Sequence, residues 1–234
     1  MTVGLVIVSH SEQIAEGVVE LAGQMAPDIV IVAAGGIEDG GTVRIGTSFE
    51  RVQEAIERAL SAEGAVILTD LGSAVMTAES VLDFMEPADR ERVRLAEAAL
   101  VEGAVAAAVQ AQGGSSLDEV LRAAEGAVVP RTEAAPADAP VDAGVKAGAE
   151  ASGSWTLRNQ TGLHARPAAA LATGLLNLDA DVQINGVDGK SVVLLMTLGL
   201  GQGKTLTAEA TGPDARAAVD FIGEAVESGF GEAQ

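Results

Sequence analysis

The sequence contains no cysteine, and aromatic residues make up only 2% of it. Without cysteine, the protein has no disulfides, thiolate metal sites or cysteine nucleophiles. Two histidines and no cysteine are a poor basis for a zinc site. The scarcity of aromatic rings argues against binding of single-stranded nucleic acid, because such binders stack bases on aromatic side chains. The core must therefore be built from Ala, Val, Leu and Ile.

Basic residues are also scarce. The chain has 34 acidic and 14 basic residues and a formal net charge of −20. Such a chain repels phosphate backbones and anionic membranes, so we expect neither nucleic acid nor a membrane as a partner. The apolar segment 3–8, VGLVIV, is too short to span a membrane, and no basic segment precedes it. We therefore expect a cytoplasmic protein.

The first half of the chain alternates strand-like and helix-like segments. Apolar runs at 3–8, 29–34, 65–69 and 92–98 are typical of buried strands in a parallel sheet. The segments with a helical pattern are 12–24, 48–62, a segment after Ser73, 101–112 and 116–126. This alternation predicts an open, doubly wound α/β domain over residues 1–128.

The second half has a different organisation. Residues 129–153 lose all periodicity and are rich in Pro, Ala, Asp and Gly, which predicts a flexible linker. Residues 154–234 then follow the order β-α-β-β-α-β-α. This order predicts a small α+β open-faced sandwich, in which helices cover one side of a single sheet.

His10 lies just beyond the first predicted strand. Ligands of open α/β sheets gather at the carboxyl ends of the strands. The glycine-rich segment 35–42, GGIEDGGT, and Asp70 in DLGS leave the same predicted edge. Glycines can bring backbone N–H groups close to an anion, and a carboxylate can hold one imidazole tautomer. The pattern predicts that the three meet in a site; a surface histidine beside a polar turn is the alternative.

His164 lies in the stretch TGLHARPAAALA, at the predicted start of a helix. Pro167 suits a first helical turn, where its missing N–H is not needed. A helix start supplies N–H donors and a partial positive charge, and Arg166 adds a fork-shaped cation. This combination favours an anion on the ring, such as a phosphoryl group bound to nitrogen. A histidine that only caps the helix is the alternative.

The segment 198–205, LGLGQGKT, is similar to a phosphate-binding P-loop. The P-loop pattern, however, requires glycine where Leu198 stands. Alternating strand-like residues follow it, whereas a P-loop is followed by a helix. The segment is therefore predicted to be a glycine-rich turn.

Two stretches, TGLHARPAA and KSVVLLMTLGL, resemble HPr, the histidine phosphocarrier of the bacterial phosphoenolpyruvate-dependent phosphotransferase system. The resemblance covers about residues 154–230. It implies that His164 receives a phosphoryl group from enzyme I on a ring nitrogen and that Arg166 stabilises it. Ser191 falls on the position that kinase-regulated HPr proteins phosphorylate, although the segment before it is shorter than usual. A helix N-cap is the plainer interpretation of Ser191.

Residues 1 to about 128 resemble the mannose-family enzyme IIA fold. Their sequence is similar to that of the phosphotransferase subunit of PEP-dependent dihydroxyacetone kinase. The similar stretches are GLVIVSHS, AAGGIEDGGTVRIGTS, TDLGSAVMTAE and ALVEGAVAA. The resemblance implies that His10 carries a phosphoryl group and that Asp70 orients its ring. It also implies a homodimer, for which the Ala- and Val-rich segment 98–109 is the candidate interface.

Together the resemblances imply a phosphoryl relay. The group would pass from phosphoenolpyruvate to enzyme I, a separate protein, and then to His164 and His10. From His10 it would reach ADP on the nucleotide-binding kinase subunit, whose ATP phosphorylates dihydroxyacetone held by the substrate-binding subunit. Neutral imidazole is nucleophilic, and positioning and electrostatics carry such transfers, so we expect neither a cofactor nor a metal. The alternatives are a mannose-type sugar-transport component that passes phosphate to a IIB partner, and a sensor that regulates by binding.

Overall fold

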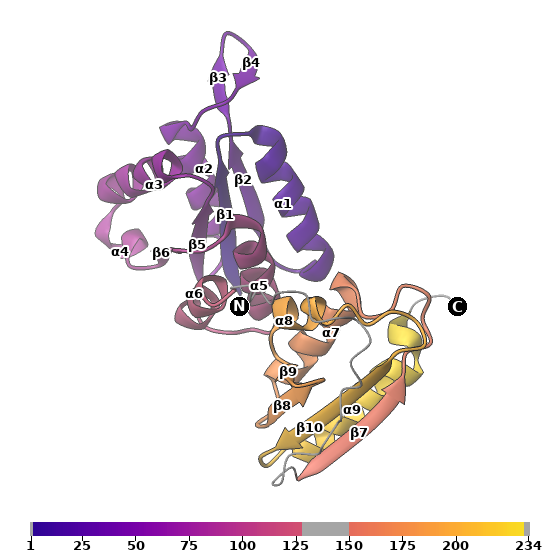
Figure 1. The fold of residues 1–234 in the computed structure, drawn as a ribbon. Helices are drawn as coiled ribbons and strands as arrows, with labels where there is room; N and C mark the ends of the chain where they lie inside the picture. The colour runs from indigo at the N-terminus through magenta and orange to yellow at the C-terminus, as the bar shows by residue number, and fades with distance from the viewer. Residues whose placement is uncertain (1, 128–149, 232–234) are drawn as a thin grey trace. The chain divides into compact units, whose positions relative to one another are not determined.

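The computed structural model describes residues 2–127 and 150–231, which fall into two compact units (Figure 1). One unit lies within residues 1–128 and the other within 129–234. Most of the predicted linker, residues 129–149, lies outside the described residues. Within the two described ranges, no helix is long and apolar enough to cross a membrane.

A four-stranded parallel sheet forms the centre of the first unit, in the order β2-β1-β5-β6. Its strands are β1 (Val3–Ser9), β2 (Ile31–Gly35), β5 (Gly64–Thr69) and β6 (Val93–Leu95). Val6 pairs with Val32 on one side and with Ile67 on the other. Strands β1 and β5 are buried along their whole length, which explains their continuous apolar sequences. The four predicted strands are confirmed, although β6 is shorter than the predicted segment 92–98.

Helices cover both faces of this sheet (Figure 1). They are α1 (Glu12–Met25), α2 (Phe49–Ala59), α3 (Gly72–Phe84), α4 (Pro87–Arg90), α5 (Leu100–Gln112) and α6 (Leu117–Glu125). One core cluster joins α1, α5 and α6 to one sheet face, and a second joins α2 and α3 to the other. The side chains of Ser11 and Ser48 cap the starts of α1 and α2. This is the doubly wound α/β domain that the alternating pattern predicts.

Helix α5 belongs to the internal core of the first unit. Seven of its residues, all between Gly103 and Ala111, are buried. They pack against α1, α6 and the sheet, and a Cβ on Gly103 would lie only 2.9 Å from the Leu68 side chain. The Ala- and Val-rich composition of segment 98–109 therefore serves close packing within one unit. The buried residues of this segment are therefore not available for a dimer interface, and the homodimer itself stays a prediction.

A two-stranded hairpin stands where the sequence predicts a glycine-rich loop. Strands β3 (Ile37–Asp39) and β4 (Thr42–Arg44) pair in antiparallel fashion and project beyond β2 (Figure 1). Between them, Gly40 and Gly41 have positive φ values of 60° and 83°, which glycine adopts without steric cost. Three residues per strand are too few for alternating polarity to reveal a strand in the sequence.

The second unit contains an antiparallel sheet in the order β7-β10-β8-β9. Its strands are β7 (Ala151–Thr156), β8 (Asp181–Ile184), β9 (Val187–Asp188) and β10 (Thr205–Thr211). The prediction of a linker that extends to residue 153 is wrong, because β7 begins at Ala151. Ala151 and Gly153 pair with Ala210 and Ala208. In the sequence, small residues of this kind are typical of a linker. Only their pairing with β10 shows that they form a strand.

Helices cover the sheet of the second unit. They are α7 (Ala165–Leu176), α8 (Val192–Thr197) and α9 (Ala215–Glu227), followed by the 3₁₀ turn η1 (Gly229–Gly231). Helix α9 packs on β7, β10 and β8 and also contacts α7. Gly223 brings α9 close to the sheet, since a Cβ there would lie 3.0 Å from the ring of Trp155. The element order β-α-β-β-α-β-α confirms the predicted small α+β sandwich.

Candidate functional site

His10 lies at the carboxyl edge of the parallel sheet, between β1 and α1. Asp70 directly follows β5, so the parallel pairing of β1 with β5 brings the two residues together. Asp70 Oδ1 lies 2.9 Å from His10 Nδ1, and Asp70 Oδ2 accepts the backbone N–H of His10 at 2.9 Å. The two side chains are 19% and 16% exposed. The predicted convergence of His10 and Asp70 is confirmed.

Both carboxylate oxygens of Asp70 also accept hydrogen bonds from other donors. The Ser9 hydroxyl donates to Oδ2 at 2.9 Å, and the Leu71 N–H donates to Oδ1 at 2.7 Å. Burial by itself raises the pKa of Asp70, but the hydrogen bonds from His10, Ser9 and Leu71 outweigh it and hold the pKa below its ordinary value. Asp70 is therefore an ionised acceptor at neutral pH. The hydrogen on Nδ1 of His10 points toward it.

The other ring nitrogen of His10 faces Ser73, whose Oγ lies 2.6 Å from Nε2. Because Nδ1 carries the hydrogen of the neutral ring, Nε2 carries the lone pair and accepts the hydroxyl hydrogen of Ser73. With its hydrogen on Nδ1, the ring keeps its lone pair on Nε2, which is the atom that can act as a nucleophile.

Ser73 also places Nε2 at the start of a helix. It is the second residue of α3, and the N-cap residue Leu71 makes no side-chain capping hydrogen bond. The first N–H groups of a helix have no acceptor within the helix, and with the helix dipole they favour a nearby anion. Sequence reasoning missed Ser73. Its one signal is its position in DLGS, where the helix begins.

The glycine-rich segment meets His10 through its backbone. The Gly36 N–H donates to the Ser9 carbonyl at 3.1 Å, and the Gly46 N–H donates to the His10 carbonyl at 2.9 Å. The prediction that N–H groups of segment 35–42 approach an anion is therefore wrong for Gly36, whose N–H already has an acceptor. The base of the hairpin instead fixes the backbone that carries the His10 ring.

Arg51 of α2 connects the end of β2 with the start of α1. Its guanidinium donates to the Gly35 carbonyl and, at 2.9 Å, to Glu12 Oε1. The two elements approach closely here, since a Cβ on Gly35 would lie 2.6 Å from the Ser11 carbonyl oxygen. Arg51 thus holds the end of β2 against the start of α1, the helix that follows the His10 turn. No motif in the sequence signals this contact.

His164 is the N-cap residue of α7, with an extended backbone (φ −87°, ψ −173°). Its carbonyl accepts the Ala168 N–H at 3.0 Å, but its side chain makes no capping hydrogen bond. Arg166 and the buried Pro167 follow in the first turn, as the sequence predicts. The ring is therefore at a helix start without serving as the cap. This placement favours an anion-carrying histidine over a capping one.

The turn before His164 is held by the segment that is similar to a P-loop. The Leu163 N–H donates to the Leu200 carbonyl at 2.8 Å. Gly162 has a φ of 65°, and a Cβ there would lie 2.1 Å from the Leu200 carbonyl oxygen. Any side chain at position 162 would separate the two turns. Segment 198–205 continues into β10 and is a turn, as predicted.

Ser191 is the N-cap of α8, and its Oγ accepts the Leu194 N–H at 3.4 Å. Its interpretation as a helix cap is confirmed, while regulatory phosphorylation at this position stays a prediction. No group of three or more His, Asp or Glu side chains within residues 2–127 and 150–231 is arranged to hold a metal ion.

Two family models match the two units in turn. The model of the PTS system fructose IIA component matches residues 4–121, and the model of the PTS HPr component phosphorylation site matches residues 151–228. The first range contains His10 with Asp70, and the second contains His164. The division of the chain by family thus agrees with its division into compact units.

Curated relatives match nearly the whole chain. The phosphoryl donor subunit DhaM of PEP-dependent dihydroxyacetone kinase from Providencia stuartii is 36% identical over 98% of this chain and 50% of the relative. The DhaM of Escherichia coli is 36% identical over 99% of this chain and 51% of the relative. A Listeria innocua DhaM is 45% identical over 47% of this chain and 82% of the relative. The chain belongs to the DhaM family. It spans about half the length of the Providencia and Escherichia members.

Proposed function

We propose that this chain relays a phosphoryl group from enzyme I of the phosphotransferase system to dihydroxyacetone kinase. The group passes from phosphoenolpyruvate through enzyme I to His164 and then to His10. From His10 it passes to ADP on the nucleotide-binding kinase subunit, and the resulting ATP phosphorylates dihydroxyacetone on the substrate-binding subunit. The printed names of the relatives, which are phosphoryl donors of a PEP-dependent kinase, support this function.

The orientation of the His10 ring is the observation that carries the proposal. Asp70 accepts the Nδ1 hydrogen, so the lone pair of Nε2 points toward Ser73. In the transfer, the N–P bond of the donor histidine breaks as a bond forms between phosphorus and Nε2. The ring gains positive charge in this step, and the ionised Asp70 offsets it. The phosphoryl oxygens then lie at the start of α3, where the Ser73 hydroxyl turns to donate to one of them.

The surroundings of His164 support its role as the first carrier. The ring stands at the start of α7, with the guanidinium of Arg166 two residues away. A phosphoryl group on a ring nitrogen would experience the helix dipole and this cation. Both stabilise the anion without a metal ion.

The sugar-transport alternative differs from the kinase relay in its acceptor. It requires transfer from His10 to a IIB subunit, whereas the kinase relay requires transfer to ADP on a kinase subunit. The names of the relatives favour the kinase. A sensor that acts only by binding would need neither acceptor.

Reconstitution tests the proposed function. Enzyme I, phosphoenolpyruvate, this chain and both kinase subunits with ADP are expected to produce dihydroxyacetone phosphate from dihydroxyacetone. Leaving out any one component should stop the product. Product that still forms without this chain, or no product with all components present and folded, would contradict the proposal.

The homodimer and the cytoplasmic location also belong to this proposal. Sedimentation equilibrium of the full chain should give twice its mass of 23.5 kDa. The buried residues of α5 cannot contribute to a dimer interface, whereas Val101 at the start of this helix is 41% exposed. A monomer at working concentrations would contradict the dimer and leave the relay intact.

A further inference from the structure

One exposed row of side chains on α3 is uncharged and begins at the candidate site. Ser73, Met76, Ser80 and Phe84 recur at spacings of three and four residues, so they lie on one side of the helix. All four are exposed, with Met76 at 67% and Phe84 at 83%. In a chain with a net charge of −20, a row with two exposed large apolar side chains is suited to contact with another protein, and the exposed carboxylates of Glu79 and Asp83 lie beside it.

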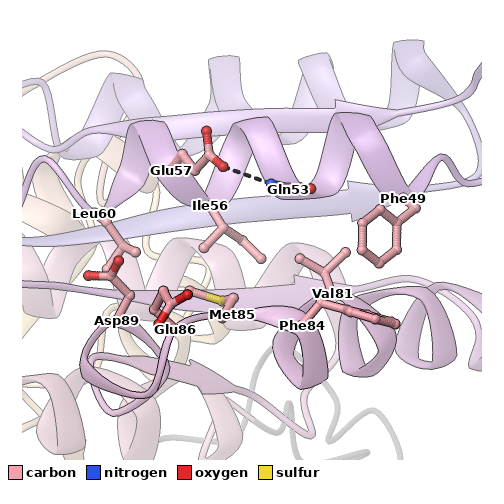
Figure 2. Close-up of a pocket in the computed structure, with 10 residues that line it drawn as sticks. All are labelled: Phe49, Gln53, Ile56, Glu57, Leu60, Val81, Phe84, Met85, Glu86 and Asp89. Carbon is pink, nitrogen blue, oxygen red and sulfur yellow. Dashed lines mark hydrogen bonds between the residues drawn. The ribbon is translucent and has the colours of Figure 1, made fainter.

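Phe84 ends this row at a groove between α2 and α3, shown in Figure 2. The groove has a volume of about 550 Å³. Its apolar lining residues are Phe49, Ile56, Leu60, Val81, Phe84 and Met85. The rings of Phe49 and Phe84 meet edge to face, with centroids 5.8 Å apart. A groove of this kind accepts an apolar anchor side chain of a partner.

The polar rim of the groove is acidic. Its polar lining residues are Gln53, Glu57, Glu86 and Asp89. The described lining therefore includes three carboxylates and no cation. Asp89 pairs with Arg92 at 3.4 Å outside the lining, and Glu57 accepts a hydrogen bond from Gln53 at 2.9 Å. Charge complementarity favours an occupant whose apolar anchor is flanked by Lys or Arg.

Helix α3 joins this groove to the candidate site. Ser73 contacts Nε2 of His10, and Phe84 lies eleven residues further along, or about 17 Å at the helical rise of 1.5 Å per residue. A protein interface of ordinary size spans this distance. A partner whose reacting group meets Nε2 therefore covers the row and reaches the groove with the same face.

We propose that the α2–α3 groove anchors the subunit that accepts the phosphoryl group from His10. The inference rests on the proposed function, and it assigns the acceptor an apolar side chain flanked by basic residues. The donor histidine, His164, is part of the same chain, so its effective concentration near His10 is high without an anchor. The acceptor arrives from solution. Binding of the acceptor to a surface outside the reacting groups would therefore raise the fraction of time that it spends next to His10.

The test measures transfer from phosphorylated His10 of the full chain to the nucleotide-binding subunit of dihydroxyacetone kinase with ADP. The subunit concentration is varied. Phe84→Ser should raise the half-saturating concentration about tenfold. This is the factor expected when the groove loses most of the apolar area that Phe84 buries against the partner. The rate at saturation should not change, because Phe84 does not contact the reacting ring.

A charge reversal and two matched controls accompany this variant. Glu57→Lys should also raise the half-saturating concentration, because it opposes a basic-flanked anchor, and added salt should narrow the difference from the unaltered chain. The controls are Leu21→Ser and Glu20→Lys, at exposed positions of α1. They should leave the half-saturating concentration unchanged.

Since the chain has no cysteine, Ser80→Cys gives a single attachment point for an environment-sensitive fluorophore. Its emission should shift when the kinase subunit is added, and the same label at Glu20→Cys should not respond. Adding Phe84→Ser to the Ser80→Cys chain should move the emission shift to higher subunit concentrations. Far-UV circular dichroism establishes that each variant is folded.

The outcomes separate the anchor from the function on which it rests. If the unaltered, charged chain transfers nothing to the subunit at any concentration, the proposed function fails. If transfer occurs but folded Phe84→Ser and Glu57→Lys chains both saturate like the unaltered chain, only the anchor is overturned. If Phe84→Ser instead slows the charging of His10 from His164, the donor occupies the groove, and the assignment to the acceptor is overturned.

Discussion

Asp70 holds both the ring and the backbone of His10. Its Oδ1 lies 2.9 Å from Nδ1 of the ring, and its Oδ2 accepts the His10 N–H at the same distance. One carboxylate therefore sets the rotation of the imidazole, its tautomer and the position of the turn from which it extends. In consequence, Nε2 is directed at Ser73 and the start of α3.

Asp70→Asn should keep the fold and slow phosphoryl transfer at His10. An amide can accept the Nδ1 hydrogen but cannot offset the positive charge that develops on the ring. Each loss of about 1.4 kcal/mol in this stabilisation slows the step tenfold, and we expect a decrease of at least that size. Rapid-quench, single-turnover transfer from His10 measures it. An unchanged rate would reduce Asp70 to a turn residue.

Ser73→Ala should slow transfer at His10 without changing the ring tautomer. The Ser73 hydroxyl is hydrogen-bonded to Nε2 of His10. A hydrogen bond to a charged phosphoryl group contributes about 1.5–3 kcal/mol, which corresponds to roughly tenfold or more in rate. The ring ¹⁵N shifts should still report hydrogen on Nδ1. Ser152→Ala, at an exposed position of β7, is the control and should behave like the unaltered chain. A tautomer change in Ser73→Ala would mean that Asp70 alone does not set it.

The lowered pKa of Asp70 predicts a contribution to acid stability. A carboxyl whose pKa is lower in the folded state stabilises the fold above its ordinary pKa, which is 3.8 here, and loses this contribution as pH falls through the folded value. Asp70→Asn should therefore reduce the slope of the unfolding free energy against pH in the acid range. The reduction should correspond to at most about one bound proton. Denaturant unfolding at a series of acidic pH values, followed by amide signals of the first unit, measures this. Asp83→Asn, at an exposed position, is the control; an equal reduction of the slope by both would contradict a special role for Asp70.

Single replacements of the two histidines should separate the two stations of the relay. His10→Ala should still accept acid-labile phosphate at His164 but deliver none to the kinase. His164→Ala should accept none from enzyme I, and adding a separate HPr should restore charging of His10. If His10→Ala no longer accepts any phosphate from enzyme I, the order of the stations is reversed.

The segment between the units should act only as a tether. Because β7 begins at Ala151, the exchangeable part ends before that residue. Replacing residues 129–149 with a Gly/Ser sequence of equal length should leave phosphoryl flux nearly unchanged, because effective concentration depends on reach rather than sequence. A large loss of flux in a folded protein would assign this segment a specific contact.

Much of the fold was predictable because the periodicity of apolar residues is a local property. The buried strands β1 and β5 read as continuous apolar runs, and the β7–α9 order follows from short alternating segments and turns. The failures occurred where composition and tertiary context disagree. Ala151 and Gly153 resemble a linker until they pair with β10. The small residues of α5 resemble an interface until α1, α6 and the sheet cover them.

The sequence by itself pointed to the two histidines and to the residues that directly accompany them, but not to Ser73. His10 and Asp70 each follow a buried strand, and adjacent parallel strands end at one edge, so their meeting follows from the pattern alone. His164, Arg166 and Pro167 are consecutive enough that a helix start places them together without further information. Only the tertiary structure decided what surrounds these rings. Three contacts join residues that are distant in sequence: Ser73 with Nε2 of His10, Arg51 with β2 and α1, and Gly162 with Leu200. Such contacts depend on how whole elements pack, and packing distances are not encoded in any local pattern.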